Sequence, residues 1–186
     1  MNSIILASGS PRRKEILNNH EIPFRVCVSE VDETCDHKSP KEMVMELSKR
    51  KALAVFTDYP NEIVLGADTV VAYKDEILGK PKNDEDAFRM LHMLQGHSHQ
   101  VYTGVTICSK DLVKTFYEKT DVIVRPMSED EIYSYIATGE GCDKAGSYAI
   151  QGLFKPYISS FEGDYENVVG LPGKKVKEQL FAHFIK

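Results

Sequence analysis

The chain has 186 residues, 42% hydrophobic and 27% charged, which is a globular composition long enough for one core, so we predict a single domain over residues 1–186. The formal net charge of −5 argues against nucleic acid as a partner, because such binding depends on clustered Lys and Arg. No apolar run approaches the ~20 residues that span a bilayer and residues 1–7 lack a basic start, so we expect a cytoplasmic protein with no membrane partner.

The first elements alternate between strand and helix. Residues 4–7 are apolar and predict a short buried strand, and Ser10 with the following proline predicts the start of a helix that runs to about residue 20. Residues 24–28 predict a second strand, and the polar, acidic residues 29–38 predict a loop.

A well-marked helix follows this loop. Ser39, Pro40 and Glu42 form a capping box with proline at the first helical position, and the helix should run to about residue 57. Residues 62–73 are mostly aliphatic and predict a buried strand, which we expect to be interrupted at residues 66–69.

The second half mixes hairpins with helices. A turn at residues 74–75 should lead into a short strand at 76–78, followed by a helix over about 84–95. Residues 100–108 and 112–125 predict a long antiparallel pair.

Two further helices complete the pattern. Ser128 and Glu131 form a capping box for a helix that Gly139 stops, and the last helix covers about residues 174–184. Because helices are interleaved with strands and some strands are joined by hairpins, the expected fold class is α/β with a mixed sheet.

Lys51 is out of place in the second helix. On a helical wheel it lies in the middle of an apolar stripe that contains Val44, Leu47 and Val55. An unpaired buried ammonium is costly, so Lys51 must either extend to the surface or pair with an anion in a cleft. Both interpretations stay open on this evidence alone.

Asp68 interrupts the apolar residues of the strand over 62–73. An ionised carboxylate in such a place must pair, bind a metal or take up a proton. A strand-end aspartate bonded to nearby amides is the simpler alternative.

The junction between the first strand and the first helix has anion-binding chemistry. It reads SGSPRR over residues 8–13, which puts the Ser8 hydroxyl, free helix N–H groups and the guanidiniums of Arg12 and Arg13 together. A capped helix with solvated arginines is the structural alternative. Lys80 adds a cation after another strand, and Glu33 lies on the acidic loop, so these groups together could hold a metal and a polyphosphate.

These motifs resemble the Maf (septum formation inhibitor) family of nucleotide pyrophosphatases along nearly the whole chain. The segments that carry the resemblance are ASGSPRR at 7–13, SEVDE at 29–33, GADT at 66–69, GKP at 79–81, HQVYT at 99–103, DKAGSYAIQG at 143–152 and GDYENVVGLP at 163–172.

The resemblance implies a fold and a reaction. The fold would be a curved mixed β-sheet flanked by helices with a deep central cleft, similar to the inosine triphosphate pyrophosphatases. The reaction would be hydrolysis of a nucleoside triphosphate between its α- and β-phosphates, with dTTP and UTP as the implied substrates.

The resemblance also implies residue roles. Asp68 would accept a proton and, with Glu33, hold a divalent metal cation, Mg²⁺ or Mn²⁺. Lys51 and Lys80 would contact phosphate. A further set would select the base, namely Arg12, Thr69 and Gln151.

Two other functions stay open beside dTTP and UTP hydrolysis. One is a pyrophosphatase for 7-methyl-GTP or other non-canonical nucleotides, and the other is a non-catalytic regulator of cell division. Modified pyrimidine nucleotides belong with dTTP and UTP as further candidate substrates of the implied enzyme. The sequence does not reveal the oligomeric state, for which a homodimer is the candidate assembly.

Overall fold

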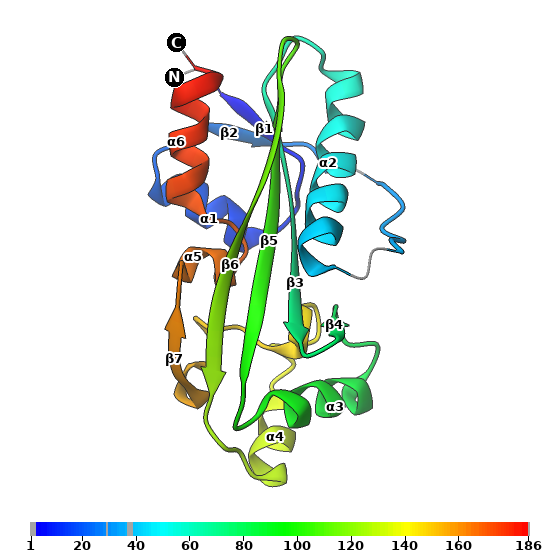
Figure 1. The fold of residues 1–186 in the computed structure, drawn as a ribbon, viewed down its shortest axis with the longest axis vertical. Helices are drawn as coiled ribbons and strands as arrows, with labels where there is room; N and C mark the ends of the chain where they lie inside the picture. The colour runs from blue at the N-terminus through cyan, green and yellow to red at the C-terminus, as the bar shows by residue number, and fades with distance from the viewer. Residues whose placement is uncertain (1–2, 29, 37–38, 186) are drawn as a thin grey trace. The chain divides into compact units, whose positions relative to one another are not determined.

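The computed structural model describes residues 3–28, 30–36 and 39–185, which form an α/β fold built on a mixed sheet (Figure 1). The strands follow the order β2-β1-β3-β5-β6-β7, and β4 pairs with β3. Pairing is parallel for β1 with β2 and with β3, and antiparallel for β3 with β4 and for β6 with β7. The strands are β1 (Ile4–Leu6), β2 (Phe24–Val26), β3 (Val64–Tyr73), β4 (Glu76–Leu78), β5 (Ser98–Cys108), β6 (Val113–Val124) and β7 (Ile158–Glu162). The α-helices are α1 (Pro11–Asn19), α2 (Pro40–Asp58), α3 (Asp84–Leu94), α4 (Glu129–Ile136), α5 (Tyr165–Val169) and α6 (Gly173–His183).

The chain divides into two compact units. Unit 1 comprises residues 1–69, 103–118 and 170–186, and unit 2 comprises residues 70–102 and 119–169. Three long strands, β3, β5 and β6, contribute residues to both units. No helix within the described residues is long and apolar enough to cross a membrane.

Unit 1 contains two successive parallel crossover connections. The chain passes from β1 through α1 to β2 on one side, and then from β2 through α2 to β3 on the other side of β1. Because such connections are right-handed, two that run in opposite directions place α1 and α2 on opposite faces of the sheet (Figure 1).

Unit 2 has its own aromatic core. Tyr135, Tyr148 and Phe154 are buried, and the Phe154 ring lies 4.9 Å from each of the other two rings. The helix α4 is anchored by the expected capping box, in which the Ser128 side chain accepts from the Glu131 amide and the Glu131 carboxylate accepts from the Ser128 amide.

Most of the predicted elements are confirmed, with differences at particular residues. The expected interruption of the long strand at 66–69 is wrong, because β3 runs unbroken from Val64 to Tyr73. Ser10 stands at the N-cap of α1 as expected, but its side chain makes no capping hydrogen bond. The sequence did not predict β7 or α5.

Candidate active site

The candidate site lies where the two crossovers of unit 1 diverge, next to the carboxyl end of β1. Leu6, the last residue of β1, pairs with Leu65, and β3 then continues beyond the end of β1. The loop of residues 8–10 therefore begins alongside residues 66–69 of β3. In open α/β sheets, ligands bind at the carboxyl ends of strands where successive connections leave in opposite directions.

Two glycines allow α2 to lie directly against the sheet of unit 1. A Cβ atom at Gly66 of β3 would stand 2.5 Å from the backbone oxygen of Ser48 and 2.7 Å from the backbone nitrogen of Ala52. A Cβ atom at Gly104 of β5 would stand 2.1 Å from the backbone oxygen of Val44. The missing side chains let the helix backbone contact the strands, and this brings Lys51 to β3.

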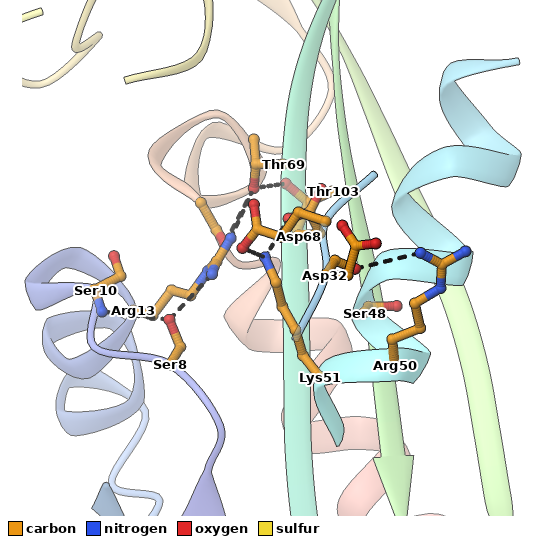
Figure 2. A network of polar contacts seen from close by, with 12 residues as sticks. Ser8, Ser10, Arg13, Asp32, Ser48, Arg50, Lys51, Asp68, Thr69 and Thr103 are labelled. Atoms are coloured by element: carbon orange, nitrogen blue, oxygen red, sulfur yellow. Dashed lines mark hydrogen bonds and ion pairs between the residues drawn. The ribbon is translucent and has the colours of Figure 1, made fainter. Parts of the chain in front are cut away.

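Lys51 joins the two candidate carboxylates. Its Nζ lies 2.6 Å from Oδ1 of Asp68 (Figure 2). The same Nζ lies 2.9 Å from Oε1 of Glu33. The side chains of Lys51 and Asp68 are each 12% exposed, whereas that of Glu33 is 61% exposed. Lys51 and Asp68 therefore form a direct ion pair, which compensates the charge of each.

Arg13 organises the opposite face of β3. Its Nε donates to the carbonyl of Gly170 at 2.9 Å, Nη1 to Oγ of Ser8 at 3.1 Å, and Nη2 to Oγ1 of Thr69 at 3.2 Å (Figure 2). Thr69 also shares a hydrogen bond of 2.9 Å with Thr103 of β5. Burial lowers the pKa of Arg13 below its ordinary value, and the negative charge of Asp68 opposes this effect.

The start of α1 keeps donors available. The Ser8 hydroxyl accepts from the Ser10 amide at 3.3 Å, and no side chain caps the helix. Arg12 is half-buried, and its guanidinium makes no hydrogen bond or ion pair among the described residues. Uncapped N–H groups and an unengaged guanidinium beside a second guanidinium favour the binding of an anion.

Two predicted site residues lie in unit 2. Lys80 follows β4 and is exposed, and Gln151 is exposed in a turn in which the Gly152 amide donates to the Ala149 carbonyl. The predicted roles of Lys80 and Gln151 stay predictions. Ser29, which belongs to one of the motifs, lies outside the described residues.

The donor set fits a divalent cation of the magnesium type. Asp68 and Glu33 supply hard carboxylate oxygens on either side of one ammonium group, so a position between them already accommodates positive charge. No cluster of three or more His, Cys, Asp or Glu side chains suited to a metal occurs within the described part of the chain. Two carboxylates completed by substrate phosphates are the arrangement that Mg²⁺ commonly takes.

Sequence reasoning missed some residues that build the site. Gly104 acts by lacking a side chain and Gly170 through its carbonyl oxygen, so neither residue contributes a side-chain chemical group that would mark it as part of a site. Arg50 precedes Lys51 on α2 and contacts the acidic loop, but an arginine on a helix usually lies on a solvated face. Thr103 and Gly170 had a signal only as members of the motifs at 99–103 and 163–172.

Comparisons with known proteins agree with this geometry. A family model described as Maf-like protein matches residues 3–183. The dTTP/UTP pyrophosphatase of Bacillus mycoides (strain KBAB4) is 50% identical over 181 residues, which are 97% of this chain and 95% of that protein. The dTTP/UTP pyrophosphatase of Bacillus cereus (strain B4264) is 49% identical with the same coverage.

A solved structure, that of the Staphylococcus aureus Ham1 protein, matches with a TM-score of 0.41 and 19% identity over 66% of this chain and 72% of that one. The expected likeness to inosine triphosphate pyrophosphatases and the expected deep cleft stay predictions. The family model, in contrast, spans all the motifs that surround Lys51 and Asp68, and relatives of about 50% identity cover nearly the full length of the chain. The chain therefore belongs to the Maf family.

Proposed function

We propose that this chain is a nucleoside triphosphate pyrophosphatase that hydrolyses dTTP and UTP to the nucleoside monophosphate and pyrophosphate. The observation that carries the proposal is the triad in which Lys51 Nζ lies between the carboxylates of Asp68 and Glu33, next to the arginine-rich start of α1. The choice of dTTP and UTP rests on the names of the Bacillus relatives. We expect the enzyme to act in the cytoplasm on free nucleotides.

The positive groups suit a polyphosphate. Arg13 uses three of its five N–H groups on Ser8, Thr69 and Gly170, so two remain for phosphate oxygens. Arg12 and the uncapped α1 N-terminus add further donors. Such preorganised positive charge stabilises the negative charge that gathers on departing pyrophosphate.

Asp68 is the candidate for handling the attacking water. Water attacks the α-phosphorus, the bond between that phosphorus and the oxygen bridging to the β-phosphate breaks, and pyrophosphate leaves with the bond electrons. Asp68 orients the water and accepts its proton, and Lys51 holds the carboxylate in place. A divalent cation held by Asp68 and Glu33 would neutralise phosphate charge.

The test is pyrophosphate release by purified protein with dTTP, UTP, the other common triphosphates and 7-methyl-GTP, in the presence of Mg²⁺ or Mn²⁺. We expect dTTP and UTP to be preferred, and Asp68→Asn to lower kcat by about 10²–10⁴-fold. The matched control is Asp121→Asn in unit 2, which removes the carboxylate that pairs with Lys119 and should leave turnover near that of the unchanged protein.

Two results would overturn the proposal. Near-normal turnover of Asp68→Asn would remove this residue from the mechanism. Nucleotide binding by the unchanged protein without turnover of any triphosphate would instead favour the non-catalytic regulator.

A further inference from the structure

Arg50 contacts the loop that carries Glu33, on the side of α2 next to Lys51. Its Nη1 donates to the backbone carbonyl of Asp32 at 3.3 Å (Figure 2). The same nitrogen donates to the backbone carbonyl of Thr34 at 2.7 Å. These two carbonyls belong to the residues on either side of Glu33. One guanidinium thus holds the backbone of the loop before and after the carboxylate that reaches Lys51.

The guanidinium is itself held in place. Its Nε donates to Oε1 of Glu46 at 2.8 Å, one helical turn earlier on α2. Hydrogen bonding to Glu46 raises the pKa of Arg50 above its ordinary value, so the side chain stays charged. An arginine fixed at one nitrogen loses less freedom when its other nitrogens bind, which favours a defined contact with the loop.

The loop also has an internal brace. The Thr34 amide donates to Oδ1 of Asp32 at 2.8 Å, which closes a turn around Glu33. The turn fixes the local conformation of the loop, and the hydrogen bonds from Arg50 attach the loop to α2.

We propose that Arg50 is a positioning residue, which keeps the Glu33 carboxylate on Lys51 by binding the two carbonyls that flank it. Lys51 and Arg50 are neighbours on α2, and they hold the side chain and the backbone of the same loop residue. Glu33 is 61% exposed, so its own surroundings provide little restraint. The inference rests on the proposed function only for its effect on turnover.

The first test is kinetic. Arg50→Ala should lower kcat/KM for the preferred triphosphate by about tenfold, because the hydrogen bonds from a charged donor to the loop are lost. Arg50→Lys should recover part of the loss. The control Arg89→Ala removes an exposed arginine of unit 2 that also makes two carboxylate contacts, and it should stay within twofold of the unchanged protein.

A double-mutant cycle separates positioning from a general structural effect. If Arg50 acts through Glu33, Arg50→Ala should cost little or nothing further in a Glu33→Gln background. An undiminished tenfold loss in that background, or a single Arg50→Ala variant within twofold of the unchanged protein, would overturn the inference.

The second test does not depend on turnover. In Arg50→Ala, hydrogen exchange at the Thr34 amide should become about tenfold faster, while exchange in β1 and β3 is unchanged. Unchanged exchange at Thr34 would refute the positioning role of Arg50 even if the protein hydrolyses dTTP. If exchange is faster but the protein hydrolyses no triphosphate, the positioning role is supported and only the proposed function is rejected.

Discussion

Replacing Gly66 by Ala tests whether direct contact between α2 and β3 holds the site together. The new methyl group would lie 2.5 Å from the Ser48 backbone oxygen, 2.7 Å from the Ala52 backbone nitrogen and 2.9 Å from the Ala52 Cβ atom. All three atoms belong to α2, and two of them are backbone atoms, so no side-chain rotation can relieve the overlap. The helix must move outward from the strand by several tenths of an ångström or more.

The expected cost follows from this geometry. Overpacking of a well-filled interior destabilises by about 1–3 kcal/mol, and the rigid helix backbone places Gly66→Ala in the upper part of that range. The lower conformational freedom of alanine in the unfolded chain opposes this by about 0.5–1 kcal/mol. We therefore expect a net loss of about 1–2 kcal/mol in the free energy of unfolding.

The assay is urea unfolding, with Gly79→Ala as the matched control. A Cβ atom at Gly79 would meet nothing within 4 Å, so this variant should unfold within about 0.5 kcal/mol of the unchanged protein. The same outward movement should draw Lys51 away from Asp68 and lower kcat/KM. If Gly66→Ala is no less stable than Gly79→Ala, the inferred contact between helix and strand is wrong.

Two further predictions concern buried charge. Lys51→Met leaves Asp68 without its ion pair and should lower the free energy of unfolding by about 2–3 kcal/mol. In an Asp68→Asn background the same substitution should cost much less, as measured by urea unfolding. Equal losses in both backgrounds would show that the ion pair contributes nothing. His99 is buried with Nε2 bonded to Tyr148, and burial lowers its pKa to about 4. Between pH 6.5 and about 4, therefore, His99 binds a proton in the unfolded chain but not in the folded chain, so the free energy of unfolding should fall by about 3 kcal/mol as the pH falls through this range. Urea unfolding at the two pH values should show a smaller fall in His99→Phe. An equal fall in both proteins would refute the lowered pKa of His99.

The sequence predicted the chemistry of unit 1 better than its geometry. Asp68 and Lys51 were recognised because a charge in an apolar strand or helix face needs compensation, and the structure pairs them at 2.6 Å. The sequence could not show that the partner of each is the other, because 17 residues separate them along the chain. The hydrogen bond from Arg13 to Gly170 was hidden for the same reason, since the two residues are 157 positions apart in the chain.

Two elements of unit 2 were missed because their patterns are weak. The strand β7 lies at the edge of the sheet, where it pairs only with β6 and is mostly exposed. Its sequence therefore lacks the alternation of apolar and polar residues that marks a half-buried strand. The helix α5 has five residues, too few to show a helical period. Its buried Asn167 donates to the Val101 carbonyl and to Oγ1 of Thr120, so distant contacts rather than local pattern hold it.

The apparent interruption of β3 at residues 66–69 has a physical explanation that the apolar pattern conceals. Side chains of a strand alternate between faces, so Gly66 and Asp68 point to one face, and the two residues beside them, Ala67 and Thr69, point to the other. The first face receives α2, which requires the glycine for close approach and supplies Lys51 to the aspartate. The second face receives α1, whose Arg13 donates to the threonine. Each face of β3 therefore carries one small residue and one polar residue. The small residue leaves room for a helix, and the polar residue binds the cationic side chain of that helix. The segment departs from an apolar strand in composition but not in conformation, because the helices satisfy the polar groups that a buried strand would otherwise leave without partners.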